Sequence, residues 1–383
     1  MSKSKIIQSK NIVISTQCFP PEIGGIENLM EGLSNSLLKN KFKLFVFADS
    51  KNRLKEQQYD KNQKYEIIRY KGIKIIRRRR KSLDIKKFIS IKKNVHFIIC
   101  DTWKSAEHLI KVVDLKNTKI LCLAHGNDIL TKRSLIKQRR LEKVFSKVKY
   151  IIANSYFTRN KIKNLSINSS KIKVIYPGIN SINLPSKKQK LFNKYNYFKP
   201  ILITIARLEK RKNHIKIIYA INDLLKEYNN LLYLIAGDGP EKKRLSKIIN
   251  KLNLNRNVKL LGKVNEKEKA SLFDISDLHI MPTIDDKYSH SIEGFGISYI
   301  EAGMFGVPSI SSGIGGTKES VINNKTGIIC DPNNIFSIKN SIKKILNNQK
   351  KYKKISFNAK NFSKKFIWDN VIKSYIDILK KDT

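Results

Sequence analysis

The chain has 383 residues, more than a single hydrophobic core usually organises, so two domains are expected. Its hydrophobic content of 41% and charged content of 28% are those of a globular protein and exclude an intrinsically disordered chain, despite a formal net charge of +46. The four cysteines are far apart and form no Cys-x-x-Cys pair, which argues against a zinc site or a disulfide framework and favours a reducing cytoplasm.

The positive charge comes from 63 Lys and only 14 Arg. Proteins that recognise nucleic acids rely on arginine forks, whereas here lysine is spread over nearly every polar segment together with abundant Asn and Ile. An AT-rich genome explains this composition better than a polyanion-binding role, so we expect no nucleic-acid partner. A basic nucleic-acid-binding protein is still the main non-enzyme alternative. An anionic membrane surface would also attract the chain.

The N-terminal residues are too polar for a signal peptide, and no apolar run approaches the roughly 18 residues that a membrane-spanning helix needs. We therefore expect a cytoplasmic protein whose membrane contact, if any, is peripheral and at the inner face of the plasma membrane.

Residues 1–178 are predicted to form a first, doubly wound domain, because short apolar runs alternate there with amphipathic stretches. The first strand is expected at residues 11–16, followed by a helix whose apolar residues recur at helical spacing from Ile26 to Leu37. Further strands are expected at residues 43–47, 97–100, 120–124 and 150–153.

From Ile175 to Pro185 the periodicity gives way to Pro, Gly, Asn and Ser, so an interdomain linker is expected at residues 179–199. A second Rossmann-like domain is predicted over residues 200–361, and an amphipathic helix over 362–383 that returns toward the first domain. The strands of this second domain are expected at residues 201–206, 231–236, 258–261, 278–281 and 307–311. The predicted fold is α/β, with two such domains facing a cleft.

Ligands of open parallel sheets bind beyond the carboxyl ends of the strands, so the residues that follow each strand are the candidates for binding. Gly24 and Gly25 open the first helix, where backbone N–H groups can approach an anion, although a tight turn would also explain them. His125 follows the strand at 120–124 and is a candidate hydrogen-bonding partner for a ligand hydroxyl or a leaving-group oxygen.

In the second domain, Arg207 and Lys212 follow the first strand and could converge on one diphosphate beside a helix start. A solvated basic loop is an equally good explanation in so lysine-rich a chain. Arg211 could substitute for one of the two cations.

The segment from Glu293 through Gly294, Phe295 and Gly296 to Glu301 is expected to run from a loop into a helix. On a helix the two glutamates would lie about two turns apart on a similar face. A capped helix alone would explain Glu293, but not a second glutamate in an otherwise apolar helix.

Short motifs follow one another along the chain. They are Phe19-Pro-Pro-x-x-Gly-Gly, His125-Gly-x-Asp, Asn154-Ser-x-x-Thr, Tyr176-Pro-Gly, Ala206-Arg-Leu-x-x-x-Lys, Gly237-Asp-Gly-Pro, Glu293-Gly-Phe-Gly with Glu301, and Gly315-Gly-x-x-Glu. This ordered set resembles the GT-B glycosyltransferases of family 4, from residue 11 to about residue 370. Similarity to phosphatidylinositol mannosyltransferase-like members is looser.

This resemblance implies a role for each matching residue. The donor diphosphate would be bound by Arg207 and Lys212 and bordered by Gly25. Glu301 would bind the ribose hydroxyls, and the base would lie near Gly262, Lys263 and Val264. Glu293 would contact the transferred sugar together with Gly294, Phe295 and Gly296, and His125 would approach the reaction centre. The acceptor side would include Gly24, Asp128, Asn154 and Ser155. The chain departs from the family pattern at Asn213, where a glycine commonly follows Lys212, and this is expected to loosen the register of the phosphate-binding pair slightly.

The resemblance also implies a hexosyltransferase that uses a UDP- or GDP-sugar of the mannose or glucose type, retains anomeric configuration and needs no metal or other cofactor. The acceptor would be a glycan or a lipid-linked molecule in cell-surface polysaccharide, lipopolysaccharide or glycolipid synthesis. No Asp-x-Asp motif occurs in the chain, which agrees with the absence of a metal. A sugar-nucleotide epimerase of similar fold is an alternative.

Two basic segments of the first domain are candidate contacts for an anionic membrane: residues 77–81, and residues 136–148, which read as an amphipathic helix with a basic face. A basic solvent-exposed face that packs on the sheet explains them equally well.

Overall fold

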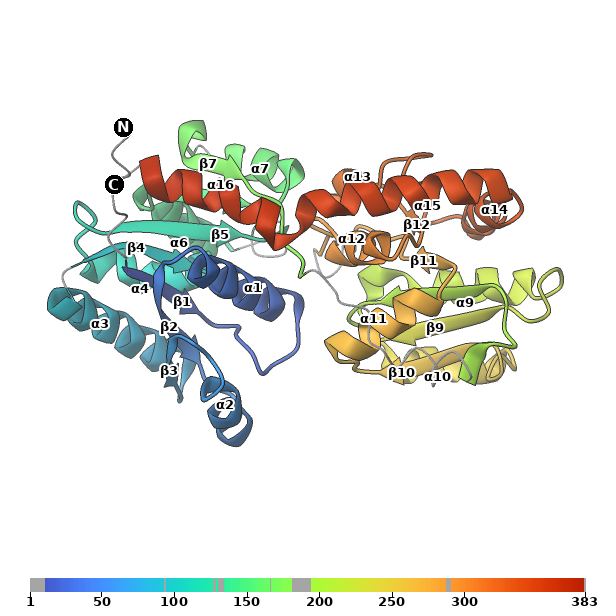
Figure 1. Cartoon of the computed structure of the whole chain (residues 1–383), viewed down its shortest axis with the longest axis horizontal. Coiled ribbons are helices and arrows are strands. Elements are labelled where there is room, and N and C mark those ends of the chain that lie inside the picture. Colours follow the sequence, from blue (N-terminus) through green and yellow to red (C-terminus); the bar gives the residue numbers. More distant parts are fainter. Residues whose placement is uncertain are drawn as a thin grey trace, which may run out of the picture. The chain divides into compact units, whose positions relative to one another are not determined.

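A computed structural model describes residues 11–381, except for residues 93, 127–128, 130–133, 166, 181–193 and 287–290. The chain forms two compact units; in Figure 1 unit 1 runs from blue to green and also includes the red helix at the C-terminus, and unit 2 runs from yellow-green to red-orange. Unit 1 comprises Met1–Asn180 and Trp368–Thr383, and unit 2 comprises Ser181–Ile367. The chain thus divides after Asn180 and after Ile367, whereas the sequence placed a linker at 179–199 and a terminal segment from 362.

Unit 1 contains a seven-stranded parallel sheet in the order β3-β2-β1-β4-β5-β6-β7. Its strands are β1 (Asn11–Thr16), β2 (Lys43–Asp49), β3 (Glu66–Tyr70), β4 (Val95–Cys100), β5 (Lys119–Ala124), β6 (Tyr150–Ala153) and β7 (Ile172–Val174). Because every strand is parallel to its neighbours, all seven carboxyl ends lie at one edge of the sheet.

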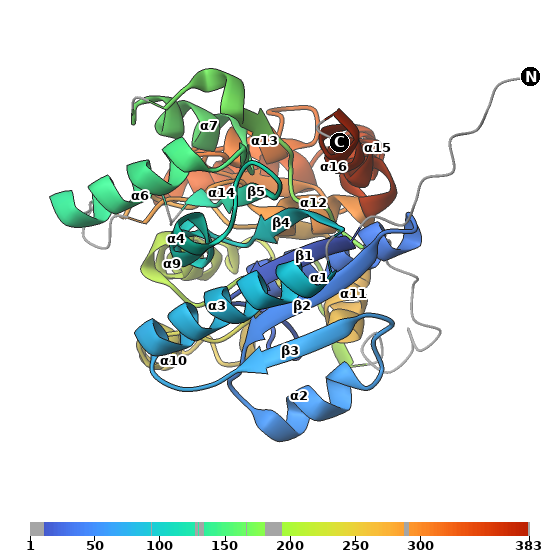
Figure 2. The ribbon, with the colours of Figure 1, turned by 90° about the vertical axis from the view of Figure 1, so that its left-hand side faces the viewer.

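Both faces of this sheet are covered, as the alternation of β1 shows: Val13 belongs to one apolar cluster, and Ile12 and Ile14 to the other. The first cluster includes residues of α3 (Lys74–Lys92), α4 (Trp103–Val112), α6 (Leu135–Lys147) and α7 (Tyr156–Lys163). The second includes residues of α1 (Gly25–Lys39) and α16 (Trp368–Lys381). Figure 2, which faces unit 1, shows α3 in front of the sheet at β2.

The last helix completes unit 1, although it follows unit 2 in the sequence. α16 packs against α1 in the second cluster, and the Trp368 ring fills the space where a Cβ on Gly32 or Gly178 would lie. Residues 362–366, which the sequence joined to this helix, instead form the end of α15 (Gln349–Ser363) and the 3-10 turn η3 (Lys364–Phe366).

Unit 2 contains a six-stranded parallel sheet in the order β10-β9-β8-β11-β12-β13. Its strands are β8 (Ile201–Ile205), β9 (Leu232–Ala236), β10 (Val258–Gly262), β11 (Leu278–Ile280), β12 (Ser309–Ser311) and β13 (Gly327–Ile329). The main apolar cluster includes residues of α9 (His214–Leu224), α10 (Lys242–Lys251), α14 (Ile335–Leu346) and α15. On the other face lie residues of α11 (Glu266–Ile275) and α12 (Ile297–Met304).

The predicted α/β class and the two parallel sheets are confirmed, but three strands were not predicted: β3, β7 and β13. β7 and β13 have three residues each, and β3 contains only one buried residue, Tyr70. The remaining elements of the described chain are α2 (Arg53–Asp60), α13 (Thr317–Ser320), η1 (Ser169–Lys171) and η2 (Lys210–Lys212). Within the described ranges, no helix combines the length and the apolarity that crossing a bilayer requires.

Candidate active site

The carboxyl edge of the unit 2 sheet brings together segments that are far apart in the sequence. β11 lies between β8 and β12, so the residues that follow these three strands meet there. The turn after β8 contains η2, and α9 begins immediately after it. The loop that precedes α12 carries Glu293 to the same place. Most of the predicted donor-binding residues belong to these segments.

Two cations of η2 converge on one carboxylate oxygen. Nζ of Lys212 and Nη1 of Arg211 both lie 2.5 Å from Oε2 of Glu293. The three side chains are nearly inaccessible, with exposed fractions of 9%, 11% and 14% for Lys212, Arg211 and Glu293. Such a cluster places two positive charges at a sheet edge where a diphosphate could take the place of the carboxylate.

From the sequence, Lys212 and Arg207 were expected to converge on one diphosphate. In the structure, however, Arg207 does not lie beside Lys212. The Arg207 side chain is 74% exposed, and its Nη1 lies 3.2 Å from Oε1 of Glu209. Oε2 of Glu209 accepts a hydrogen bond from Nε of Arg211 at 3.0 Å. Arg207 therefore joins the cluster only through Glu209, and Arg211, considered only as a substitute, is the direct companion of Lys212.

Burial and the charges within the cluster shift the pKa values of Glu293, Lys212 and Arg211. Burial opposes ionisation of Glu293, but the Lys212 and Arg211 charges outweigh it and lower the pKa of Glu293 to about 2. Burial lowers the pKa of Lys212, while the Glu293 charge acts in the opposite direction. Burial also disfavours the charged form of Arg211, yet Glu293 and Glu209 raise its pKa above the ordinary value. Glu293 is therefore an ionised carboxylate held by cations.

Asn213 fixes the turn that carries both cations. It adopts the left-handed conformation, with φ of 62°, which asparagine tolerates better than most residues. Its Nδ2 donates to the carbonyl oxygens of Pro282 at 3.1 Å and Pro332 at 2.7 Å. The expectation that Asn213 loosens the register is wrong, because its side chain anchors the turn to two other loops.

Glu293 lies in a loop, not on the helix of Glu301: α12 begins at Ile297, after Gly296 with φ of 86°. The predicted two-turn spacing on one helical face is therefore wrong. The loop is fixed from outside by the glycines after β12, since the N–H of Gly316 donates to the carbonyl oxygen of Glu293 at 2.9 Å. A Cβ on Gly316 would lie 1.9 Å from the carbonyl oxygen of Gly294, so only glycine permits this approach.

The neighbouring residues of this loop also have defined places. Phe295 is buried, and its ring packs against that of Phe366 at 5.5 Å. Its carbonyl oxygen accepts a hydrogen bond from Ser320 at 2.7 Å. The predicted sugar-binding segment of Gly294, Phe295 and Gly296 is therefore a packed backbone, whose N–H groups rather than side chains are the candidate donors.

Glu301 lies on α12 and has a partner that the sequence did not indicate. Nζ of Lys269, on α11, lies 2.5 Å from Oε1 of Glu301 and 2.9 Å from Oε2 of Glu266. The Lys269 side chain is 8% exposed. Burial disfavours its charged form, but Glu301 and Glu266 raise the pKa of Lys269 above the ordinary value. Nothing in the sequence distinguishes Lys269 from the other lysines on helices. Only its contact with Glu301 in the structure identifies it.

The predicted base region lies next to this pair. Gly262 ends β10 with φ of 74°, and Lys263 and Val264 lead to α11. α11 begins with a capping box between Asn265 and Glu268. Since Lys269 follows within the first turns of α11, one short stretch connects the candidate base contacts with the partner of Glu301.

In unit 1, His125 follows β5, and its Nε2 lies 2.9 Å from the carbonyl oxygen of Asp101. His125 is half-buried. Gly25 begins α1, and a Cβ on it would meet no atom within 4 Å. Gly24 lies beside the carboxylate of Glu27. Asp128 lies outside the described residues.

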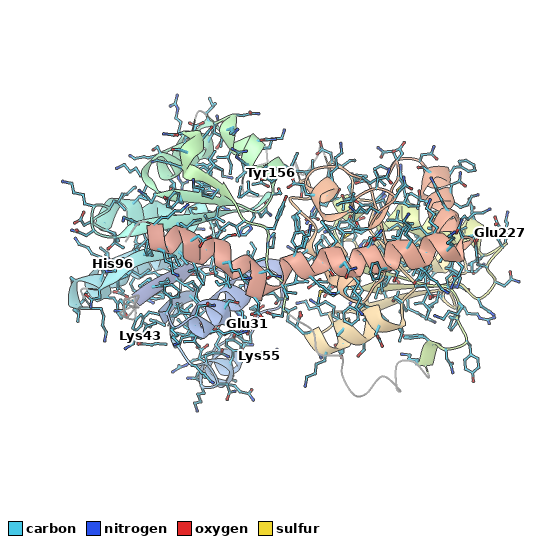
Figure 3. All side chains as sticks on the ribbon, turned by 45° about the horizontal axis from the view of Figure 1, so that its top comes forward. Glu31, Lys43, Lys55, His96, Tyr156 and Glu227 are labelled. Atoms are coloured by element: carbon cyan, nitrogen blue, oxygen red, sulfur yellow. The ribbon has the colours of Figure 1, made fainter. Side chains whose placement is uncertain are left out.

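Asn154 and Ser155 have structural tasks at the start of α7. Oγ of Ser155 accepts a hydrogen bond from the N–H of Thr158 at 3.0 Å, so Ser155 is the N-cap. Oδ1 of Asn154 accepts from Oγ1 of Thr158 at 2.7 Å. The Asn-Ser-x-x-Thr motif thus builds a helix start, and Tyr156, labelled in Figure 3, begins that helix beside it with half of its surface exposed.

The run from Arg77 to Lys81 does not form the continuous surface patch expected for membrane contact. Arg78 and Lys81 are buried, and Nζ of Lys81 lies 2.8 Å from Oδ1 of Asp49. The second basic segment does match an amphipathic helix: α6 buries Leu141, Val144 and Phe145. Leu135 and Ile136 at its start are exposed.

In the ranges that the structure describes, no three His, Cys, Asp or Glu side chains are grouped so that they could hold a metal ion.

Both units match known sequence families. The description "Glycosyltransferase Family 4" matches residues 23–181, and "Glycosyl transferases group 1" matches residues 187–362. These two regions are consecutive and together cover most of the chain.

Two similar proteins align with this chain over almost the whole length of both sequences. A GDP-mannose-dependent alpha-(1-6)-phosphatidylinositol monomannoside mannosyltransferase of Mycolicibacterium smegmatis is 22% identical over 346 residues, which cover 88% of this chain and 89% of the relative. An uncharacterized glycosyltransferase of Methanocaldococcus jannaschii is 26% identical over 401 residues, with 97% and 98% covered.

Two solved structures share the fold at low identity. Anabaena HepE, crystallised with UDP and glucose, has a TM-score of 0.80 and 17% identity, with 97% of this chain and 100% of HepE covered. Sucrose-phosphate synthase of Thermosynechococcus elongatus has a TM-score of 0.79 and 17% identity, with 98% and 99% covered.

Proposed function

Because the chain belongs to the family-4 glycosyltransferases of the GT-B fold, we propose that it moves a hexose from a UDP- or GDP-sugar to a glycan or a lipid-linked acceptor in cell-surface polysaccharide or glycolipid synthesis. Two named similarities support this donor class: the mycobacterial relative is GDP-mannose-dependent, and HepE was crystallised with UDP and glucose. The name of the former also supports a glycolipid acceptor.

The observation that carries the proposal is the cluster of Arg211, Lys212 and Glu293. A nucleoside diphosphate brings more negative charge than one carboxylate, so it competes for both cations when it binds at this edge of the sheet. Arg207, exposed and tethered through Glu209, supplies a third cation from the rim. We therefore assign the diphosphate to Lys212, Arg211 and Arg207, with Gly25 as the predicted unit 1 contact.

When the diphosphate occupies the cations, Glu293 is released to accept hydrogen bonds from the hydroxyls of the transferred sugar. The backbone N–H groups of residues 294–296 then serve as donors to the same sugar. Glu293 stabilises positive charge at the reacting carbon and does not attack it. Its ionised state, held by two cations, supports this assignment.

Cations in place of a metal also stabilise the leaving diphosphate, since preorganised charge aimed at a developing anion lowers the barrier. We propose that transfer needs no metal or other cofactor. It retains configuration by a same-face substitution in which the leaving phosphate oxygen accepts the proton of the acceptor hydroxyl. His125 assists as a hydrogen-bonding contact near the reacting sugar.

We assign the nucleoside of the donor to the neighbouring region of Glu301 and Lys269. Glu301 accepts hydrogen bonds from the two ribose hydroxyls, and residues 262–264 contact the base. Lys269 orients Glu301, because it donates a hydrogen bond to Oε1, one of the two carboxylate oxygens.

For location, we propose a cytoplasmic enzyme that contacts the inner face of the plasma membrane through the start of α6. Exposed Leu135 and Ile136 would enter the bilayer surface, while neighbouring Lys137 and Arg139 meet anionic lipid headgroups. The four cysteines are free thiols, which agrees with a reducing compartment.

The test is a transfer assay of the full chain against a panel of UDP-, GDP- and ADP-sugars, preceded by thermal unfolding with each donor, because a bound donor raises the unfolding temperature. Stabilisation and slow donor hydrolysis with one UDP- or GDP-hexose, unaffected by EDTA, is the expected result. The anomeric configuration of the product, read by NMR, tests retention. Absence of stabilisation by every nucleotide in the panel would disprove the donor assignment.

A further inference from the structure

We propose that Arg69 is a positioning residue for the transfer reaction. From β3 it holds the loop between β1 and α1, and with that loop the turn at Gly24 and Gly25, in a fixed place. The link to transfer rests on the proposed function, in which Gly25 is the predicted unit 1 contact of the donor diphosphate. The attachment of the loop to Arg69 is a feature of unit 1 alone.

The loop between β1 and α1 is fastened at its start by the residue that follows β4. Oδ2 of Asp101 accepts hydrogen bonds from the N–H of Gln17 at 2.8 Å and from the Thr16 hydroxyl at 3.0 Å. Farther along the loop, within the described ranges, one hydrogen bond from a side chain of another element reaches residues 19–23. Nη2 of Arg69 donates this bond to the carbonyl oxygen of Pro20 at 2.6 Å.

The Arg69 guanidinium is itself held in one orientation by Asp60, the last residue of α2. Nε of Arg69 lies 3.1 Å from Oδ2 of Asp60, and Nη2 lies 2.6 Å from Oδ1. The two side chains are only 11% and 21% exposed. A two-point pair of arginine and carboxylate is more directional than a single contact, and low exposure limits its screening by solvent. Arg69 is therefore a fixed donor and not a mobile surface cation.

The residue before Pro20 packs against the same guanidinium. Cζ of Arg69 lies 5.6 Å from the centre of the Phe19 ring, and Phe19 is buried. The rings of Tyr59 and Tyr65 meet the Phe19 ring edge-on, each at a centroid distance of 6.4 Å. Arg69 thus contacts two successive residues of the loop, one through its ring and one through its backbone oxygen.

The helix that follows the loop is joined to the same part of unit 1. The Tyr59 hydroxyl, beside Asp60 on α2, donates a hydrogen bond to Oε1 of Glu31 on α1, which is labelled in Figure 3. The turn at Gly24 and Gly25 therefore lies between two attached points, the contacts of Arg69 before it and the contact of Glu31 after it. Loss of the Arg69 fork would release the first of these points.

A displaced turn should affect the reaction more than the binding of the nucleotide. Glycine has no side chain that could adjust to a shift of the backbone, so a contact made at Gly25 depends on where the loop lies. Displacement by about 1 Å can slow an enzymatic reaction by about 100-fold. The cations that the proposed function assigns to the diphosphate are in unit 2, and they do not depend on this loop.

Three variants test the proposal. Arg69→Met removes the fork, and Arg69→Lys keeps the charge but cannot bond both oxygens of Asp60 in the same planar geometry. Asp60→Asn leaves Arg69 in place and weakens its anchor, so it remains informative where the Arg69 variants fail to fold.

The matched control is Arg140→Met. Arg140 makes an equivalent two-point pair with Glu107 in unit 1, at 2.5 and 2.7 Å, and its Cζ lies 5.8 Å from the centre of the Trp103 ring. In the described chain neither Arg140 nor Glu107 forms a hydrogen bond with residues 17–24.

Two measurements are made on the full chain: steady-state transfer with the donor that the panel identifies, and hydrogen exchange followed by mass spectrometry. We expect both Arg69 variants to lower kcat by about tenfold or more, with little change in the affinity for free UDP or GDP. Exchange should become faster in the peptide that covers residues 17–28 and stay unchanged in β5, which reports general loosening. Asp60→Asn should show the same pattern to a smaller extent, and Arg140→Met should behave as wild type.

The outcomes separate this proposal from the proposed function. If the wild type transfers sugar and the Arg69 variants match the Arg140 control in kcat, the proposal is overturned while the proposed function stands. Unchanged exchange of residues 17–28 in the Arg69 variants would overturn it as well. Faster exchange in a protein that transfers no sugar from any donor would keep the attachment of the loop but remove its role in transfer, because the proposed function itself would have failed.

Discussion

Nζ of Lys212 and Oε2 of Glu293 lie 2.5 Å apart, although 81 residues separate them in the sequence. This contact joins a residue assigned to the diphosphate with a residue assigned to the sugar. In this structure the two charges neutralise each other, so the proposed binding of a donor diphosphate exchanges one ion pair for another. Several measurable consequences depend on this exchange.

Replacement of Glu293 by Gln should separate binding from catalysis. Without the carboxylate, Lys212 and Arg211 are free for a diphosphate, so the affinity for UDP or GDP should stay the same or rise. Transfer should fall by about 100-fold or more, because a stabilising charge at the reacting carbon is lost. Calorimetry with the free nucleotide and a transfer assay measure the two effects. A large loss of nucleotide affinity in Glu293→Gln would contradict the assignment.

The same variant should be less stable without ligand. Removal of one partner from a buried ion pair leaves uncompensated charge, which typically costs about 3–5 kcal/mol. Saturating nucleotide should restore part of this loss, since it supplies a new anion to Lys212 and Arg211. Urea unfolding with and without nucleotide measures it, and Glu241→Gln, on the partly exposed pair with Arg244, serves as the control.

The two arginines of the β8–α9 turn should differ in importance. Lys212→Ala and Arg211→Ala should each weaken nucleotide diphosphate binding by about tenfold or more, since each removes a charged donor from a desolvated position. Arg207→Ala should have a smaller effect, because its side chain is 74% exposed. Dissociation constants for UDP and GDP decide the order. A larger effect from Arg207 than from Arg211 would show that the turn rearranges on binding.

The contrast between Arg207 and Arg211 illustrates what the sequence could predict. Motif order and strand ends placed both residues at the correct edge of the sheet, because apolar runs such as 201–205 identify buried parallel strands. Which arginine turns inward depends on the backbone of η2 and on the left-handed Asn213, whose anchors come from two distant loops. Spacing along the chain does not contain that information.

Other departures have a similar origin. Glu293 and Glu301 are eight positions apart, which suggests one helix, yet close approach of Gly316 to Gly294 keeps the first glutamate in a loop. Lys269 was missed because only its contact with Glu301 distinguishes it from the other lysines of the chain. Strands β7 and β13, with three residues each, are too short to produce a periodic signal.

Substitution of Glu301 or Lys269 should weaken binding of the nucleoside part of the donor and leave binding of its phosphates unchanged. Glu301→Ala should weaken binding of UDP or GDP by about tenfold, through loss of hydrogen bonds to ribose. Pyrophosphate binding should be unchanged. Lys269→Met should reproduce the loss in part, because Glu301 then lacks the cation that orients it. Parallel titrations with nucleotide and pyrophosphate provide the comparison, and an equal loss for both ligands would refute a ribose contact.

The free energy of unfolding should depend on pH because of Glu293. Its pKa is lowered from 4.5 to about 2 in the folded protein, with burial opposing and the Lys212 and Arg211 charges causing the shift. A group whose pKa is lower in the folded state stabilises the protein above its unfolded pKa, and this contribution disappears as pH falls through the folded pKa. The difference in unfolding free energy between wild type and Glu293→Gln should therefore be largest above about pH 5 and should shrink toward pH 2. Urea unfolding at a series of pH values measures this difference. A difference that stays constant down to pH 3 would mean that Glu293 is not held as a carboxylate by Lys212 and Arg211, and the exchange on which donor binding depends would then lose its basis.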